Sequence, residues 1–145
     1  MTNIPTIARA AADIADGRLS PVVLAEECFA RIDRHERRVN AFVQLERERA
    51  LAAALKAETE IKAGRRRGPL HGIPFAHKDI YETAGIPTTC HSKLLKDYVP
   101  THDAFTVARL SDAGGAAASP PRHAVSMVRA GSLKPRQTDL CTPPG

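Results

Sequence analysis

The sequence predicts an α/β domain in which helices come first and strands follow. Up to residue 63, apolar residues recur at spacings of three and four, which is typical of amphipathic helices. After Gly68-Pro69, they fall in short runs broken by glycine and proline, a pattern that favours strands and loops. The last 30 residues hold five of the 11 prolines and none of the six aromatic residues. We therefore expect an α/β domain over residues 1–115 and a disordered tail over 116–145.

Three helices are predicted in the first part, each with recognisable ends. Thr6 precedes the first, and Gly17 supplies the left-handed residue that commonly ends a helix. Ser20 is a capping residue for the second, with proline in its first turn. The third is expected over residues 46–63, before Gly64. The apolar stripes of the three helices, of which the second is expected to be buried, are Ile7, Ala10, Ala11 and Ile14; Ala25, Cys28, Phe29 and Ile32; and Ala50, Ala54, Ala57 and Ile61.

Beyond the third helix, the sequence predicts one strand and one further helix. Residues 73–77 read as a buried strand with Pro74 near its beginning, where the missing N–H is least costly. Lys78 and Asp79 follow immediately at its end. A helix is expected over 104–110, after Asp103, and the apolar residues 39–43 are expected to be a connector between helices. Helices combined with a strand in this order indicate part of an α/β fold.

Composition excludes several classes of protein. No run approaches the roughly 18 apolar residues of a membrane span, and the N-terminus lacks the apolar core of a signal peptide. Three cysteines without C-x-x-C spacing suit a reducing compartment, so we expect a cytoplasmic protein. The net charge of +5 divides between 17 basic and 15 acidic residues in 1–115, and four basic and one acidic residue in 116–145. This basic excess lies on no aromatic-studded face, which disfavours nucleic-acid binding.

One run of motifs resembles the amidase signature family. Gly68-Pro69-Leu70-His71-Gly72-Ile73-Pro74 is followed by Lys78-Asp79 and then by Thr83-Ala84-Gly85-Ile86-Pro87-Thr88-Thr89, in the family's order and spacing. The helical N-terminus and the segment Val107-Ala108-Arg109-Leu110 are also similar, so the resemblance covers about residues 6–114. It implies the N-terminal fragment of the amidase signature fold, in which helices precede the first strands of a mixed sheet.

The resemblance also implies a chemistry. Members of the family hydrolyse carboxylic amides, or transfer the amide nitrogen, with a serine nucleophile, a second serine in a cis peptide and a lysine. Lys78 matches that catalytic lysine, and the implied substrate is a small-molecule amide. The amidotransferase component that works on misacylated tRNA shares this N-terminal signature. No cofactor is implied. A lysine that accepts a proton must be neutral, and burial beside hydroxyl groups lowers its pKa toward that condition.

The departure from the family begins after Gly114. Family members continue with a hydrophobic strand and later a Gly/Ser-rich segment that supplies both serines, whereas this chain continues with Gly115-Ala116-Ala117-Ala118 and ends without such a segment. Ser119, Ser126 and Ser132 resemble neither catalytic serine in context. Our hypothesis for this change is a frameshift near Gly114, and the alternative is a natural terminal extension. We expect the chain to be truncated and inactive on its own.

Two other readings remain open from the residues. The helices can form a non-enzymatic interaction module, or the arginine run at 65–67 and the tail can bind nucleic acid, although we expect these arginines to be a solvated run that follows a helix end. An unpaired strand at 73–77 would also favour self-association. No metal site is expected, because the spacing of His77, Cys90, His91 and His102 fits no familiar zinc pattern. Cys90 and His91 are adjacent on a segment expected to be extended, where they would point apart.

Overall fold

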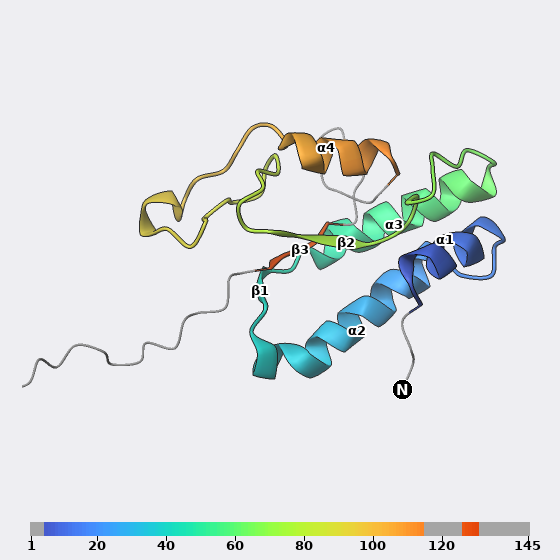
Figure 1. Ribbon diagram of the computed structural model, residues 1–145, viewed down its shortest axis with the longest axis horizontal. Coiled ribbons are helices and arrows are strands. Elements are labelled where there is room, and N and C mark those ends of the chain that lie inside the picture. Colours follow the sequence, from blue (N-terminus) through green and yellow to red (C-terminus); the bar gives the residue numbers. More distant parts are fainter. Residues whose placement is uncertain (1–4, 115–125, 131–145) are drawn as a thin grey trace, which may run out of the picture.

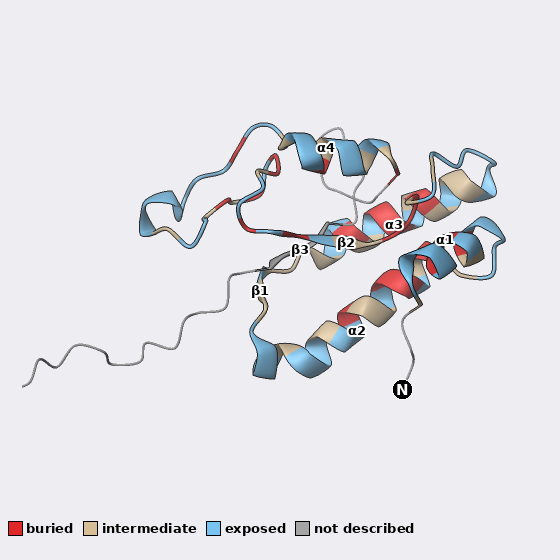
Figure 2. Cartoon of the chain, in the orientation of Figure 1, coloured by how far each residue is buried: buried red, intermediate tan, exposed pale blue. Residues whose placement is uncertain are grey.

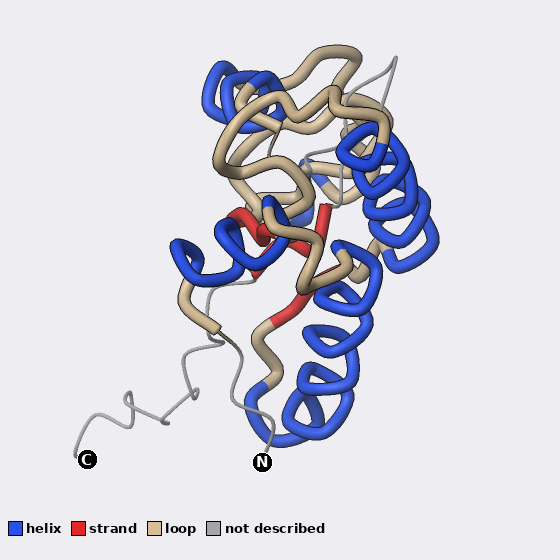
Figure 3. The backbone as a smooth tube through the Cα atoms, turned by 90° about the vertical axis from the view of Figure 1, so that its right-hand side faces the viewer, coloured by secondary structure: helices blue, strands red, loops and turns tan. Residues whose placement is uncertain are grey.

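The computed structural model describes residues 5–114 and the backbone of residues 126–130. The described part is mostly helical and carries three short strands around which the helices are arranged (Figures 1 and 3). In chain order, the elements are α1 (Ile7–Ala15), α2 (Pro21–Val39), β1 (Phe42–Gln44), α3 (Arg47–Lys62), β2 (Phe75–Lys78), the 3-10 helix η1 (Lys93–Leu95), α4 (Phe105–Asp112) and β3 (Ser126–Ala130).

The first two helices begin at the predicted caps. The Thr6 hydroxyl accepts the backbone N–H of Arg9 at 3.3 Å, and Gly17 follows α1 with a φ of 71°. The Ser20 hydroxyl accepts the N–H groups of Val22 and Val23, and Pro21 stands in the first turn of α2. Both hydroxyls satisfy N–H groups that have no partner within the helix. The predicted starts of these helices are confirmed.

Alanines on α3 allow α2 and α3 to lie close together. The buried face of α3 consists of Ala50, Ala53, Ala54 and Ala57, and α2 presents Ala25 and Phe29 to the same cluster. Small side chains bring two helix backbones near each other, so the ring of Phe29 fills most of the space between them. Figure 2 shows the buried residues gathered on the facing sides of the two helices. Of the predicted stripes, Cys28, Ile32 and Ile61 are only half-buried, and Ile7 is 63% exposed.

A second apolar cluster joins α1 to the chain that enters β2. Ala10, Ala11 and Ile14 of α1 pack with Leu24 of α2 and with Ile73. Because Ile73 lies two residues before β2, this contact fixes the approach of the strand to the helices. The helical N-terminus thus positions β2 rather than forming a separate unit.

The three strands form one sheet in the order β1-β3-β2. β1 is antiparallel to β3, and β2 is parallel to it. Figure 1 shows α4 on one side of β2 and α2 on the other. The expected connector at 39–43 is therefore partly a strand, because a segment of three residues becomes one only when a distant neighbour pairs with it.

Two expectations about the sheet are corrected. The buried strand expected at 73–77 runs over Phe75–Lys78, where only His77 is buried, and it has a neighbour, since β3 occupies one of its edges. β3 itself falls within the segment 116–145, which we expected to be disordered. Within that segment, Ser126–Ala130 form a strand whose backbone pairs with β1 and β2. The rest of the tail lies outside the described residues.

No helix in the described part of the chain combines the length and the apolar composition that are needed to cross a membrane.

Candidate active site around Lys78

Lys78 is the last residue of β2, and its side chain is exposed. Its carbonyl oxygen accepts the N–H groups of Ile80 at 2.7 Å and Tyr81 at 3.1 Å, so the chain turns away from the sheet directly after it. The Lys78 amine forms no hydrogen bond or ion pair with any residue that the structure describes. The lysine therefore stands at the expected strand end, but it is not buried as the predicted chemistry requires.

Asp79 anchors the loop that follows. Its side chain is 1% exposed and accepts two hydrogen bonds from Thr89, one from the backbone N–H at 3.0 Å and one from the hydroxyl. Its carbonyl oxygen also accepts the N–H of Cys90 at 3.1 Å. Hydrogen bonds that stabilise the charged form offset the cost of burying a carboxylate. The segment from 79 to 90 is consequently closed on the end of β2, beside Lys78.

His77, on the other side of Lys78, is also buried and bonded. Its Nε2 atom lies 3.0 Å from the hydroxyl oxygen of Thr83, which has no exposed surface. Thr83 in turn accepts the N–H of Ile86 through its carbonyl oxygen, in a turn completed by Gly85 with a φ of 75°. The three residues from His77 to Asp79 thus alternate between a buried side chain, an exposed amine and a second buried side chain.

The remainder of the motif segment is held by hydrogen bonds across the loop. Asp103 accepts the N–H of Ala84 at 2.8 Å through Oδ1, and Ala104 donates to the carbonyl oxygen of Glu82 at 2.8 Å. The phenol of Tyr98 donates to the Glu82 carboxylate at 2.7 Å, and this hydrogen bond raises the pKa of Tyr98. These contacts fix the chain that leaves Lys78 against the start of α4.

A cluster of ionisable residues around the buried His71 supports the turn that precedes β2, and sequence reasoning missed it. The His71 side chain is enclosed, with its Nδ1 accepting the backbone N–H of Arg67 at 3.1 Å and its Nε2 lying 3.2 Å from the Glu60 carboxylate. Arg67 also pairs with Glu60 at 3.2 Å. Burial lowers the pKa of His71, and the charge of Arg67 adds to this effect. The Nε and Nη2 atoms of Arg67 also lie 3.3 Å from Nε2 of His71, so the arginine side chain and the Glu60 carboxylate meet at this ring nitrogen.

The arginine run at 65–67 is thus more than the solvated run that we expected. Arg67 belongs to the cluster with Glu60 and His71, and Arg66 donates to the carbonyl oxygen of Ala11 at 3.3 Å. Desolvation raises the pKa of the Glu60 carboxylate, but the surrounding positive charges, that of Arg67 first, outweigh it and leave the pKa lowered. Position in the chain could not indicate these contacts, because Ala11 lies 55 residues before Arg66.

The histidines and cysteines considered for a metal site do not come together. His77 bonds to Thr83, His102 lies 3.1 Å from the Glu82 carboxylate, and Cys90 and His91 are exposed. Among the described residues, no three histidine, cysteine or acidic side chains are grouped as metal ligands. Cys90 and His91 have φ values of 49° and 55°, so the expectation of an extended segment is wrong at this point. A turn closed by the Ser92 N–H on the Thr89 carbonyl oxygen replaces it.

No serine in the described side chains is a partner of Lys78. The Ser92 hydroxyl caps η1 by accepting the N–H of Leu94, and the Ser111 hydroxyl donates to the Val107 carbonyl oxygen. Ser119 and Ser132 lie outside the described residues, and Ser126 is described only as backbone within β3.

Comparisons with known proteins agree with the motif run. A family model described as amidase matches residues 23–118. One component of the glutamyl-tRNA(Gln) amidotransferase of Lachnospira eligens is 45% identical over 109 residues, which are 75% of this chain and 23% of that protein. The corresponding component of the Azoarcus sp. enzyme is 50% identical over 97 residues, which are 67% of this chain and 20% of that protein.

Solved structures show the same likeness in three dimensions. The peptide amidase of Stenotrophomonas maltophilia superposes with a TM-score of 0.74 at 31% identity, over 88% of this chain and 26% of its own. Fatty acid amide hydrolase gives a TM-score of 0.77 at 24% identity, over 87% of this chain and 21% of its own, which is a likeness of fold alone. The chain spans about a fifth to a quarter of the length of these relatives. With the motif run, the fold and the family model in agreement, this chain belongs to the amidase family.

Proposed function

We propose that this chain carries the lysine-bearing part of an amide-hydrolysing site, with Lys78 as the proton acceptor. The observation that carries the proposal is the arrangement at the end of β2, where an exposed amine stands between two buried and hydrogen-bonded neighbours. The hydrogen bonds of His77 and Asp79 hold the backbone on both sides of Lys78. The position of the lysine backbone is therefore fixed, and its amine projects from it into solvent. Such an arrangement suits a group that must meet reacting atoms supplied from elsewhere in a fold.

The reaction proposed is hydrolysis of a carboxylic amide to an acid and ammonia through a serine nucleophile, a serine in a cis peptide and Lys78. In that scheme, the lysine accepts the proton that the cis serine relays from the nucleophile, and it does so only in its neutral form. Packing of the serine-bearing chain over the exposed Lys78 would supply the desolvation that favours the neutral amine. Transfer of the amide nitrogen to an acceptor is the variant that the likeness to the amidotransferase components favours.

We further propose that residues 1–145 do not turn over amides by themselves. An amine without a nucleophile or an oxyanion site has nothing to activate. The chain is incubated with aliphatic and aromatic amides and with a serine-directed fluorophosphonate, beside a Lys78→Ala control. We expect equal background ammonia release and no stoichiometric labelling. Ammonia release above that control would contradict this part of the proposal.

A chimera tests the role of Lys78 directly. Residues 1–114 replace the matching segment of the S. maltophilia peptide amidase, which superposes on this chain. We expect amide turnover in the chimera and its loss, by about a thousandfold or more, in the Lys78→Arg variant, because a guanidinium stays protonated at any working pH. Lys96→Arg, at an exposed lysine whose amine pairs with Asp97, is the matched control and should retain activity. Turnover of the Lys78→Arg chimera within a few-fold of the parent would refute the assignment.

A further inference from the structure

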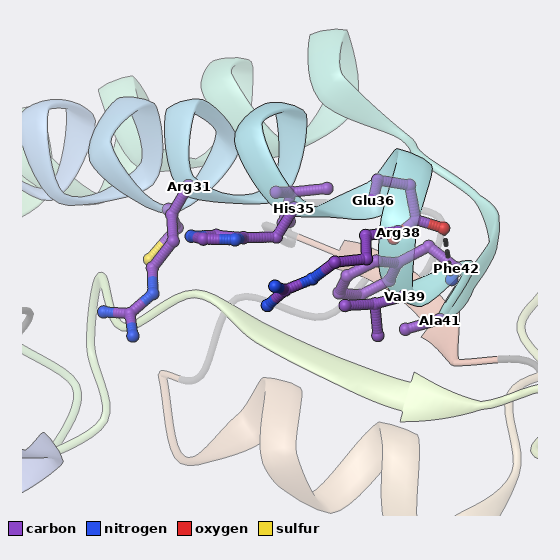
Figure 4. Close-up of a pocket in the computed structure, with 9 residues that line it drawn as sticks. Arg31, His35, Glu36, Arg38, Val39, Ala41 and Phe42 are labelled. Atoms are coloured by element: carbon purple, nitrogen blue, oxygen red, sulfur yellow. Dashed lines mark hydrogen bonds between the residues drawn. The ribbon is translucent and has the colours of Figure 1, made fainter.

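A groove of about 540 Å³ runs along the C-terminal half of α2 and the turn into β1. Lys78 does not line it, so it is separate from the candidate active site. Its floor is apolar and consists mainly of Cys28, Ile32 and Phe42, all half-buried, whose inner sides pack on the cluster around Phe29. We call this feature the α2 groove. Figure 4 shows it in close-up.

The α2 groove follows one face of the helix. Its α2 residues 28, 31, 32, 35, 36, 38 and 39 are spaced at i, i+3, i+4, i+7, i+8, i+10 and i+11, which is the spacing of one face of a helix that packs against another helix. Val39 is 44% exposed at the end of this stripe. Within the described residues, α3 packs on the Ala25 and Phe29 face of α2, and no residue of another helix lines the groove. A second helix laid along it would bury the exposed apolar surface over nearly three turns.

The walls of the α2 groove carry unpaired positive charge. Arg31 and Arg38 extend from α2 on the same side, with His35 between them (Figure 4), and neither arginine forms an ion pair with a described residue. The one acidic residue that lines the groove, Glu36, is already engaged, since its carboxylate accepts the N–H of Phe42 at 2.9 Å. Arg47, by contrast, pairs with Asp33 and lies over the Phe29 ring. Cations without an acidic partner among the described residues are thus available along the groove.

We propose that the α2 groove binds an acidic amphipathic helix of a partner protein, with apolar side chains on the floor and carboxylates facing Arg31 and Arg38. A second copy of this chain fits poorly, because α2 against α2 would oppose identical cationic stripes. The tail of the same chain is also disfavoured as occupant, since residues 116–145 hold four basic residues and one acidic. A nucleic acid would use the cations and leave the apolar floor without a partner.

The test measures binding of two designed peptides to the full 145-residue chain by fluorescence anisotropy. Both are amphipathic helices of about 20 residues with leucine at i, i+3, i+4 and i+7, flanked by glutamate in one and by lysine in the other. The groove variant is Arg31→Glu with Arg38→Glu. The matched control is Arg34→Glu with Arg37→Glu, which makes the same change of net charge on the same helix at residues that do not line the groove. Circular dichroism checks that each variant keeps its helices.

We expect the glutamate peptide to bind at least about tenfold more tightly than the lysine peptide. The groove variant should lose about tenfold in affinity for it, while the control stays within about threefold. An equal loss in both variants, or no preference between the peptides, would overturn the proposal. So would a self-associated protein that the groove variant dissociates, or a DNA duplex that displaces the glutamate peptide.

Labelling of cysteines provides a second, position-specific readout. Cys28 lies on the floor of the groove, whereas Cys90 is exposed in the motif loop. Burial raises the pKa of the Cys28 thiol, with the charge of Glu27 adding to it, so alkylation is followed at about pH 8.5. The bound glutamate peptide should slow alkylation of Cys28 by at least about fivefold and leave Cys90 unchanged. Protection of neither cysteine, or of both alike, would place the peptide elsewhere and overturn the proposal.

Discussion

The helical region (residues 6–63) and the motif segment (residues 68–110) bury different kinds of side chain. In the helical region, the buried residues are apolar, and most of them are alanines. In the motif segment, five polar side chains are buried, namely His71, His77, Asp79, Thr83 and Thr88. Apolar packing depends on volume, whereas a buried polar group depends on its partner. The first region should therefore respond mainly to changes of size, and the second mainly to changes of hydrogen bonding.

The largest effect is expected from Phe29→Ala in the helical region. Phe29 is 2% exposed and is the large side chain between α2 and the alanine face of α3. Its removal leaves a cavity that alanines cannot fill, so the free energy of unfolding should fall by about 3–5 kcal/mol. Urea denaturation measures it. Val23→Ala, at an exposed position of the same helix, is the control and should cost less than about 0.5 kcal/mol.

Gly72→Ala tests the junction between the two regions. Gly72 has a φ of 85°, and a Cβ there would lie 2.8 Å from Cγ of Pro21. The substitution adds a steric clash to left-handed strain, so we expect a loss of about 2–4 kcal/mol. Gly85→Ala shares the positive φ but has nothing within 4 Å, and it should cost only about 1–2 kcal/mol. If Gly72→Ala and Gly85→Ala lowered the free energy of unfolding equally, the contact with Pro21 would contribute nothing to stability.

Asp79 tests the polar character of the motif segment. Asp79→Ala leaves the N–H and hydroxyl of Thr89 without their acceptor, and we expect a loss of about 2–3 kcal/mol. Asp79→Asn should cost at least about 1 kcal/mol less, because the amide can still accept from the N–H and donate to the hydroxyl. Asp97→Ala, an exposed acid in the same segment, serves as control. If the alanine and asparagine variants were equally stable, hydrogen bonding to Asp79 would not hold the loop.

Acidification should weaken the motif segment through His71, with a smaller effect. The pKa of buried His71 is lowered from its ordinary value of 6.5, so below about pH 6.5 the unfolded chain binds a proton that the folded chain does not. The free energy of unfolding is unaffected by this group at higher pH and falls as the pH drops from about 6.5, by at most about 1.4 kcal/mol per pH unit. Urea midpoints at several pH values measure the slope. His71→Asn, which keeps an acceptor for the Arg67 N–H, should have a shallower slope than the parent.

The same contrast explains which parts of the fold the sequence could predict. The starts of α1 and α2 follow from Thr6 and Ser20, because a cap acts within three residues of itself. β1 could not be predicted from three residues, since its pairing partner is β3. The helices of the first region can thus be predicted from the spacing of nearby residues. The sheet cannot, because it depends on pairing between segments that are distant in the sequence.

The sequence predicted where the candidate site lies in the fold, but not which side chains surround Lys78. The motif run placed Lys78 at the end of a strand, and the structure agrees. The exposure of the Lys78 amine depends on how the following loop closes, and no local sequence pattern predicts that closure. The same holds for the hydrogen bonds between His77 and Thr83 and between Asp79 and Thr89. The cluster of Glu60, Arg67 and His71 was missed for the same reason, although three ionisable residues of both signs near a helix end were a usable signal.

Gly114 has a consequence for protein engineering. It has a φ of 83°, its carbonyl oxygen accepts the N–H of Gly72 at 3.2 Å, and a Cβ there would lie 2.9 Å from the backbone of His71. The exit of the described chain from α4 is thereby clamped to the turn that leads into β2. A protein inserted directly after Gly114, with β3 kept downstream, would leave the domain in a fixed direction, so its orientation could be set at that junction without a flexible linker.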